Sequence, residues 1–472
     1  MTDLQSDAFV FFGATGDLAY KQIFPALQAI FRHTHIDLPV IGVARRNWTT
    51  DQLCNRARDS LQRQGGLDPD AFAKLSARLQ YLSGDYGNEE TYVRLRKMLG
   101  SSTKPLHYLP IPPSEFEIVA QGLAKSGCAE NARVIVEKPF GRDLASAQEL
   151  NRTLQQFFPE SAIFRIDHYL GKEPVQNLLY FRFANSFLEP IWNRTYVDSV
   201  QITLSEEFGV ESRGRYYEEV GAIRDVVQNH IFQVLVLLAM DAPTGMGAET
   251  TRDERIRVLR AVRPLRPEDI IRGQFYGYRA EEGVAPDSQV ETFAAVRLQI
   301  ETWRWAGVPF YLRTGKKLPV TATEILVRLK RPPQAVFEEI GAGESNYFHF
   351  RLSPDVSIFL GARTKMPGDS MVGEEIKLLA CQQSGRDRSP YERLLGDAIR
   401  GDSSLFARQD SIEAAWRIVD PILKSTIPVY GYEPNTWGPA EAERLIADGS
   451  GWHNPEPVES SDSICADRKN RG

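Results

Sequence analysis

Hydrophobic and polar positions follow two different patterns along the chain, and the change falls between about residues 165 and 197. Before it, short β-rich apolar runs alternate with helical stretches, which is typical of a parallel sheet covered by helices. Amphipathic segments at 49–63 and 113–125 are the predicted crossover helices. Residues 1–173 are therefore predicted to form a doubly wound, Rossmann-type α/β domain. Its predicted strands are 8–13, 40–44, 79–82, 107–111 and 133–137.

From about residue 197 the strands become longer, and many alternate apolar with polar residues. Such alternation favours an antiparallel sheet with one solvated face. One long apolar helix is predicted at 223–240. Residues 174–458 are therefore predicted to be an α+β domain with a large, mainly antiparallel sheet, and the polar residues 459–472 a disordered tail. The predicted strands are 197–208, 291–300, 323–330, 347–352 and 356–360.

Composition narrows the class of partner. The chain has 472 residues, of which 42% are hydrophobic and 25% charged, and its net charge is −6 with acids and bases mixed along the sequence. This balance argues against a nucleic-acid or membrane partner, so an anionic ligand must be held by local basic groups. The four cysteines form no CxxC pair, which indicates a reducing compartment and gives no metal-site spacing. The cysteine pattern therefore predicts no metal site. Without a signal-peptide pattern at the N-terminus, we expect a cytoplasmic protein.

A glycine-containing turn follows the first predicted strand. Gly13 and Gly16 would allow the backbone to approach a pyrophosphate at a helix N-terminus, although their GxxG spacing alone is a weak signal. Its place on the first strand of an α/β domain favours a nucleotide site. After the second strand, Arg45 and Arg46 stand where NAD-binding domains usually offer an acid to the ribose. Two guanidinium groups there favour the 2′-phosphate of NADP, and the alternative is a solvated basic turn.

The segment 165–173 contains an acid, an imidazole, a phenol and an ammonium group. Lys172 and His168 can neutralise a phosphate, Tyr169 can donate a hydrogen bond to it, and Asp167 can accept one from a ring nitrogen. Pro174 is expected to mark the start of a helix. These residues are predicted to be a phosphate clamp beside a proton-transfer site, and the alternative is a polar loop that caps a helix.

Lys138 follows the apolar strand 133–137 and precedes Pro139. Ligands of open α/β sheets gather at the carboxyl ends of the strands, so Lys138 is expected to point into the crevice where cofactor and substrate meet. The alternative is an ordinary lysine at the end of a strand. The sequence leaves open whether the peptide bond before Pro139 is cis.

His230 lies in a strongly apolar helix, where a lone histidine is usually a core residue. Asp225 and Asn229 add polar groups near it, and an imidazole titrates close to neutral pH, as a proton acceptor should. On an α-helix, Asp225 and His230 would be rotated by about 140° from each other, so the orienting acid is expected elsewhere. Asp167 is the candidate for that acid. Two further residues are candidates for the same cavity. Glu206 could accept hydrogen bonds from hydroxyl groups, and Lys316, which follows a glycine, could reach an anion. Each alone is more typical of a surface charge.

Six segments together closely resemble the glucose-6-phosphate dehydrogenase family over nearly the whole chain. They read GATGDL, VIVEKPFGRDL, RIDHYLGKE, RGRYYEEVGAIRDVVQNH, RWAGVPFYLRTGK and YEPNTWGP, and RIDHYLGKE is highly specific for the family. The resemblance implies that C1 of glucose 6-phosphate is oxidised to a 6-phosphogluconolactone, with hydride transfer to NADP. It also implies a homodimer or homotetramer built through the antiparallel sheet.

The resemblance assigns roles to individual residues. It implies that His230 is the base, that Asp167 orients it, and that Lys138 lies between sugar and cofactor. The implied phosphate ligands are His168, Tyr169 and Lys172, and the implied sugar ligands are Glu206 and Asp225, with Lys316 as a further substrate contact. The implied NADP contacts are Gly13, Thr15, Gly16, Asp17, Leu18, Arg45, Asp85, Tyr86 and Lys138.

The chain departs from the family pattern after Pro319. Many relatives carry a basic residue there that assists substrate binding, whereas residues 320–323 read Val-Thr-Ala-Thr. Fewer cations would then hold the phosphate, although Lys317 could compensate. Tyr20 also replaces a frequent basic residue, with Lys21 beside it. The alternatives left open are a dehydrogenase of another hexose 6-phosphate, one that also accepts NAD, and an inactive sugar-phosphate or NADP-binding regulator.

Overall fold

The computed structural model describes residues 5–34, 36–334, 336–337, 345–368, 371–381, 388–446 and 450–457. The chain divides into two compact units. The first unit is Met1–Glu173, Pro243–Asp253 and Asp387–Glu413, and the second is Pro174–Ala242, Glu254–Arg386 and Ala414–Gly472. The predicted boundary between the domains 1–173 and 174–458 coincides with the first boundary between the units, after Glu173. The first unit also contains the later segments Pro243–Asp253 and Asp387–Glu413, which the predicted first domain did not include. The predicted tail at 459–472 lies outside the described residues.

The first unit is built on a six-stranded sheet in the order β3-β2-β1-β4-β5-β6. Each neighbouring pair is parallel. This confirms the predicted doubly wound sheet, to which the structure adds β6 and moves the fourth strand two residues toward the N-terminus. The strands are β1 (Ala8–Phe12), β2 (Val40–Ala44), β3 (Leu79–Ser83), β4 (Pro105–Leu109), β5 (Arg133–Glu137) and β6 (Ile163–Ile166).

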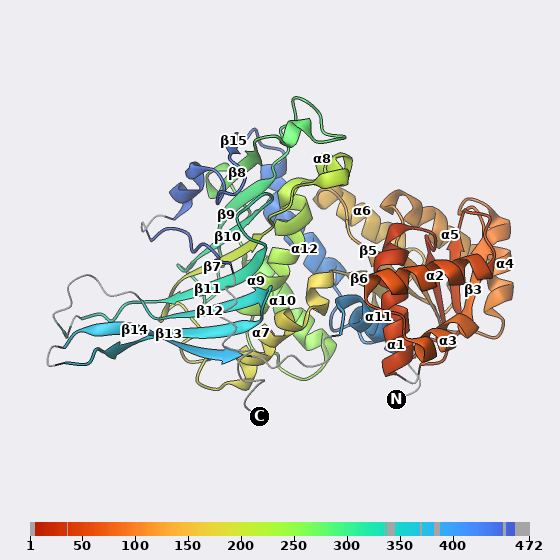
Figure 1. The fold of residues 1–472 in the computed structure, drawn as a ribbon, viewed down its shortest axis with the longest axis horizontal. Coiled ribbons are helices and arrows are strands. Elements are labelled where there is room, and N and C mark those ends of the chain that lie inside the picture. Colours follow the sequence, from red (N-terminus) through yellow and green to blue (C-terminus); the bar gives the residue numbers. More distant parts are fainter. Residues whose placement is uncertain are drawn as a thin grey trace. The chain divides into compact units, whose positions relative to one another are not determined.

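Successive residues of β1 enter two different apolar cores, because side chains alternate between the faces of a sheet. Phe9 and Phe11 of β1 belong to one core, which includes residues of α1, α2, α3 and α11. Val10 and Phe12 belong to the other, which includes residues of α4 and α5. The unit therefore has three layers, with helices on both faces of the sheet (Figure 1). The main helices are α1 (Phe24–His33), α2 (Thr50–Gln64), α3 (Pro69–Arg78), α4 (Glu89–Leu99), α5 (Phe116–Lys125), α6 (Leu144–Gln155) and α11 (Pro390–Arg400).

The second unit is built on a nine-stranded sheet in the order β14-β13-β12-β11-β7-β10-β9-β8-β15. Only the pairs β7–β10 and β8–β15 are parallel among its described strands, which confirms the predicted mainly antiparallel sheet. The predicted strands all appear, with ends shifted by up to five residues. The strands are β7 (Val197–Ser205), β8 (Ile270–Phe275), β9 (Phe293–Gln299), β10 (Pro309–Gly315), β11 (Ala322–Leu329), β12 (Tyr347–Ser353), β13 (Ser357–Lys365), β14 (Gly373–Cys381) and β15 (Val429–Tyr432).

The two faces of this sheet differ in chemistry. Phe348 and Phe350 of β12 meet Trp192, and Phe310 of β10 meets Trp305, on the apolar face. The indoles of Trp192 and Trp305 donate to the carbonyls of Leu238 and Ala239, so the C-terminal end of α9 (Phe232–Ala239) lies over this face. The opposite face carries buried polar side chains and receives the segment 450–457. Those polar side chains include Gln201, Thr203, Arg313 and Glu324.

The predicted helix at 223–240 is two segments with different geometry. A π-helix, η6 (Ile223–Ile231), leads into α9 (Phe232–Ala239), and α8 (Gly214–Ala222) precedes them with a kink at Gly221. The whole stretch Glu211–Ala239 is long and apolar enough to cross a membrane, but 83% of its most apolar window is buried inside the protein. Such burial is typical of a core helix. The other main helices are α7 (Glu173–Ala184), α10 (Ala248–Ala261) and α12 (Gln409–Leu423).

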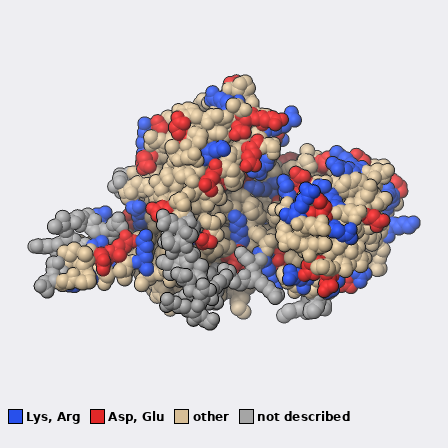
Figure 2. Space-filling view, in the orientation of Figure 1, with Lys and Arg blue, Asp and Glu red and all other residues tan. Residues whose placement is uncertain are grey.

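Charges of both signs are interspersed over the described surface that Figure 2 draws. This agrees with the mixing of acids and bases along the sequence. Anionic ligands must then be recognised by local groups of cations, which directs attention to the ends of the strands.

Candidate active site

The turn after β1 is tight and open to ligand approach. Gly13 has φ +62°, and a Cβ there would lie 3.1 Å from the carbonyl oxygen of Pro110, so the position favours glycine. The amide of Gly16 donates to the Gly13 carbonyl at 2.8 Å. Thr15 and Leu18 are half-buried, whereas Gly16 and Asp17 are exposed. The turn runs directly into a short π-helix, η1 (Ala19–Ile23), and then into α1.

Four of the residues predicted to contact NADP come together at the carboxyl ends of three adjacent strands. The amide of Gly13, after β1, donates to Tyr86 Oη at 2.8 Å. Arg45, after β2, lies with its guanidinium 5.2 Å from the centre of the Tyr86 ring and its Nε 3.3 Å from Asp85 Oδ2. Asp85 and Tyr86 follow β3. Parallel pairing of β1, β2 and β3 brings these loops to one edge of the sheet, where ligands of such folds bind.

Acids surround Arg45 more closely than the sequence suggested. Its Nη2 contacts Glu115 Oε1 at 2.5 Å in addition to the Asp85 contact. Arg46 lies over the ring of Trp48 at 5.5 Å, and Arg56 lies over Tyr20 at 4.8 Å. Arg56 was missed by sequence reasoning, because it lies inside helix α2, and only the fold brings it near the glycine turn. Its Nη2 donates to the Gly16 carbonyl at 3.4 Å.

Lys138 lies at the carboxyl end of β5, and its peptide bond with Pro139 is cis. The preceding Glu137 accepts a hydrogen bond from Tyr108 Oη at 2.5 Å. Burial raises the pKa of Glu137 to about 7, although the hydrogen bonds from Tyr108 and Tyr391 oppose this rise. A carboxyl group that titrates near neutral pH therefore adjoins the predicted crevice lysine.

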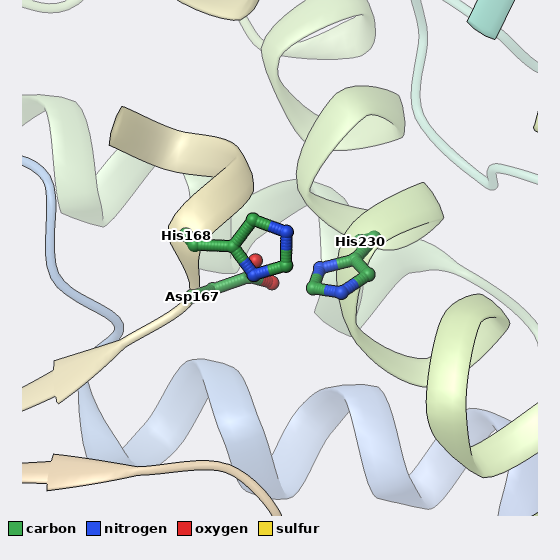
Figure 3. Close-up of side chains that lie close together, drawn as sticks. All are labelled: Asp167, His168 and His230. Atoms are coloured by element: carbon green, nitrogen blue, oxygen red, sulfur yellow. The ribbon is translucent and has the colours of Figure 1, made fainter. Parts of the chain in front are cut away.

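The predicted phosphate clamp forms a compact loop after β6. Asp167 caps the short helix η4 (His168–Gly171), because its Oδ1 accepts from the Tyr169 amide at 3.0 Å. The Lys172 ammonium lies 3.7 Å from the centre of the Tyr169 ring, and the His168 ring lies 5.2 Å from that ring. Figure 3 shows Asp167 and His168 at the start of this loop. Helix α7 begins at Glu173, as the Pro174 signal predicts.

His230 lies near the end of η6 and is 5% exposed (Figure 3). Its amide donates to Asn229 Oδ1, and Asn229 Nδ2 donates to the Arg224 carbonyl at 3.0 Å. The α-helical rotation assumed for Asp225 and His230 is wrong, because hydrogen bonds in a π-helix join residues five apart and place them on adjacent turns. The argument that the orienting acid must come from elsewhere therefore loses its basis. The pairing of His230 with Asp167 would join the two units, and it stays a prediction.

The remaining predicted substrate residues gather around two tyrosines in the second unit. Lys316 forms an ion pair with Glu206 and lies 5.6 Å from the centre of the Tyr217 ring. Burial first, and then the charges of Asp225 and Glu206, raise the pKa of Tyr217 far above its usual range. Tyr216 Oη donates to Asp225 at 3.4 Å. Sequence reasoning missed both tyrosines, although they stand in the quoted segment RGRYYEEVGAIRDVVQNH.

The segment that departs from the family pattern is held by hydrogen bonds. Thr321 accepts from the Glu207 amide at 3.0 Å and donates its own amide to Glu207 at 3.2 Å. Lys317 has φ +53°, and its amide donates to the Phe208 carbonyl at 3.1 Å. The backbone around 317–321 is thus fixed in the absence of the usual basic residue.

Known proteins match both parts of the chain. Residues 10–177 match the family described as "Glucose-6-phosphate dehydrogenase, NAD binding domain", and residues 179–453 match "Glucose-6-phosphate dehydrogenase, C-terminal domain". Glucose-6-phosphate 1-dehydrogenase 1 of Mycobacterium tuberculosis (strain CDC 1551 / Oshkosh) is 43% identical, with 95% of this chain and 97% of that protein covered. Glucose-6-phosphate 1-dehydrogenase of Aggregatibacter actinomycetemcomitans is 39% identical, with 94% and 97% covered.

Two solved structures agree with these matches. The crystal structure of glucose-6-phosphate 1-dehydrogenase from Mycobacterium avium has a TM-score of 0.91 and 43% identity, with 97% of this chain and 100% of that chain covered. A glucose-6-phosphate dehydrogenase in complex with its substrate glucose-6-phosphate has a TM-score of 0.88 and 34% identity, with 96% and 99% covered. The chain therefore belongs to the glucose-6-phosphate dehydrogenase family.

Proposed function

We propose that this chain oxidises D-glucose 6-phosphate at C1 to 6-phospho-D-glucono-1,5-lactone, with NADP as the hydride acceptor. The observation that carries the proposal is the match to both family domains over residues 10–177 and 179–453. The reaction is the first step of the oxidative pentose phosphate pathway in that family.

The turn after β1 fits the pyrophosphate of a dinucleotide. The positive φ of Gly13 and the exposed Gly16 leave the backbone accessible there, and Tyr86 holds the Gly13 amide. Arg45 and Arg46 follow β2, at the place where the 2′-phosphate of NADP would lie. NADP would supply C4 of its nicotinamide ring as hydride acceptor. Thr15, Asp17, Leu18 and Asp85 would line the same site.

The chain's own residues would bind the sugar and remove its proton. His230 would accept the proton of the C1 hydroxyl as general base, and Asp167 would orient its ring. His168, Tyr169 and Lys172, which the loop after β6 gathers, would hold the 6-phosphate. Glu206, Asp225 and Lys316 would hold the rest of the sugar, and Lys138 would lie between sugar and cofactor. No metal has a role in this scheme.

Another hexose 6-phosphate, or NAD in place of NADP, is the second candidate. It is favoured by the absence of a basic residue at 320–323 and by the two acids beside Arg45. An inactive regulator that binds NADP or the sugar phosphate is the third. The presence of Asp167, Lys172 and His230 together argues against it.

Steady-state rates decide among these candidates. Purified protein is mixed with glucose 6-phosphate and NADP, and NADPH is followed by its absorbance, with NAD and with mannose 6-phosphate and galactose 6-phosphate as comparisons. The proposal requires the highest kcat/KM for glucose 6-phosphate with NADP. A higher value for another sugar or for NAD would favour the second candidate, and no turnover with any pair would favour the third.

The assembly and location belong to the same proposal. We expect a cytoplasmic homodimer or homotetramer that assembles through the nine-stranded sheet. Light scattering coupled to gel filtration tests the assembly, and a monomer at micromolar concentration would contradict it.

A further inference from the structure

A second cluster of ligand-type side chains lies in the second unit, and none of the residues assigned above belongs to it. Glu324 lies on β11, His349 on β12 and His453 in the segment 450–457, and one potential ligand atom of each lies within 4.8 Å of the others. Glu324 Oε2 is 2.8 Å from His349 Nε2 and 2.9 Å from His453 Nε2. The centres of the two imidazole rings lie 4.7 Å apart, and the ring planes are inclined by 73°.

The sheet register brings the first two residues to one face. Glu324 pairs with Arg351 across β11 and β12, and His349 stands two residues before Arg351, so it projects to the same side. Arg351 Nε donates to Glu324 Oε1 at 2.7 Å. The guanidinium thus occupies one carboxylate oxygen and leaves Oε2 to the histidines. Glu324 is 1% exposed and His349 is 12% exposed.

The third residue is held in place through its own backbone. The His453 amide donates to Gln201 Oε1 at 2.7 Å, and its carbonyl accepts from Arg313 Nη2 at 2.7 Å. The neighbouring Trp452 indole donates to the Ala442 carbonyl at 3.1 Å. These contacts hold the segment 450–457 on the polar face of the sheet. The backbone at His453 is therefore already placed so that its ring reaches Glu324.

The geometry points to a zinc site formed by Glu324 Oε2, His349 Nε2 and His453 Nε2, with a water molecule as the fourth ligand. Two imidazoles and one carboxylate are a donor set that zinc uses. Tetrahedral zinc separates its ligand atoms by about 3.3 Å, so each observed contact needs to lengthen by less than about 1 Å. A neutral imidazole can carry its single proton on Nδ1, which frees Nε2 for the metal.

Two further observations fit this site. Metal-bound carboxylates are usually hydrogen-bonded through their other oxygen, and Arg351 makes that bond here. His453 is 30% exposed, which gives an ion a path from solvent. Bound zinc would tie the segment 450–457 to β11 and β12. The site is independent of the proposed function, and its test does not depend on activity.

Metal binding tests the proposal directly. The full chain is stripped with a chelator and titrated with Zn²⁺, and Co²⁺ is used as a spectroscopic probe. One Zn²⁺ per chain and the intense visible bands of tetrahedral Co²⁺ are expected. Glu324→Gln and His453→Gln should lose both signals. His33→Gln is the matched control, because it removes another histidine that pairs with a glutamate: His33 Nδ1 lies 2.8 Å from Glu392 Oε1. This variant should retain both the zinc stoichiometry and the Co²⁺ bands.

Hydrogen exchange locates the ion without a mutation. Zn²⁺ should slow amide exchange in 450–457 and in β12, and it should raise the unfolding temperature by several degrees. Hydrogen exchange is measured on the parent chain, so it tests the site even if a variant does not fold. Failure to bind stoichiometric zinc would overturn the proposal. Full binding by both variants, or binding without protection of 450–457, would also overturn it.

Discussion

The two sheets place their polar side chains in different ways. In the six-stranded parallel sheet, most buried side chains of the strands are apolar, although His107 and Arg165 are also buried there. The predicted binding residues follow the strands: Gly13, Arg45, Asp85, Lys138 and Asp167. In the nine-stranded sheet, buried polar residues such as Arg313 and Glu324 line one face of the strands themselves. Helices cover both faces of the parallel sheet, so ligands can bind only at the ends of its strands. A mainly antiparallel sheet can leave one face free of helices, and polar side chains can lie on that face. A polar residue at a strand end is therefore a candidate for binding, and one within a strand is a candidate for stability.

The largest expected effect concerns His230, the proposed general base in the second unit. His230→Ala should lower kcat by about 10²- to 10⁴-fold, because a general base contributes that much. The dissociation constant of glucose 6-phosphate, measured by calorimetry, should change little. His33→Ala is the control, since it removes a histidine of the first unit that pairs with Glu392. A His230 variant with near-normal turnover would show that the base lies elsewhere.

A buried cation of the polar face should have the next largest effect. Arg313 is 1% exposed, its Nη1 donates to Asn454 Oδ1 at 2.9 Å, and burial lowers its pKa to about 9. Arg313→Ala should lower the free energy of unfolding by about 3 kcal/mol, because it opens a cavity and leaves buried acceptors unpaired.

Arg313→Met separates these two causes. Methionine retains much of the volume and removes the cost of burying a charge, so it should lose less than half as much stability. Denaturant unfolding measures both variants. Equal losses would show that the charge, and not the packing between Trp437 and Trp452, is what stabilises this face.

Glu137 provides a pH-dependent test in the first unit. Burial raises its pKa from 4.5 to about 7, so between these values the folded state binds more protons than the unfolded state. Its contribution to stability is therefore full below pH 4.5 and is lost as the pH rises through 7, by about 3 kcal/mol at most.

Glu137→Gln should remove this pH dependence. The stability of the variant relative to the parent chain should rise between about pH 5 and pH 8 in denaturant unfolding. His107 provides the opposite slope, because burial lowers its pKa to about 4 and stability then falls as the pH drops below 6.5. A constant difference between variant and parent would show that Glu137 is not protonated near neutral pH.

The two sheets also differ in how far the sequence predicts them. In the first unit, buried apolar runs predicted Val40–Ala44 and Arg133–Glu137 with their observed bounds. In the second, β14 (Gly373–Cys381) carries three charged residues and β15 (Val429–Tyr432) is only four residues long, so neither has a clear apolar pattern. The π-helix η6 was missed because its apolar spacing resembles that of an α-helix.

The predicted sites differ in the same way. Local segments revealed the loop after β6 and the glycine turn, because their members are close in sequence. Arg56 of the cofactor edge was missed, since it lies within a helix. The cluster of Glu324, His349 and His453 was missed because its contacts join residues 25 and 129 positions apart. Only strand pairing and the return of the C-terminal segment bring these side chains together.

The smallest expected effect concerns an exposed residue at a strand end. Arg46→Gln should raise the KM for NADP about tenfold, which corresponds to about 1.4 kcal/mol for a lost charge-assisted contact with the 2′-phosphate. Arg45→Gln should raise it less, because Asp85 and Glu115 already offset that guanidinium. The KM for NAD should stay constant in both variants, since NAD lacks the phosphate. Both should also retain the unfolding temperature of the parent chain, because exposed charges contribute little to stability. If either variant lost as much unfolding free energy as Arg313→Ala, strand-end residues would stabilise the fold as strongly as residues on the polar face. That result would contradict the comparison between the two sheets.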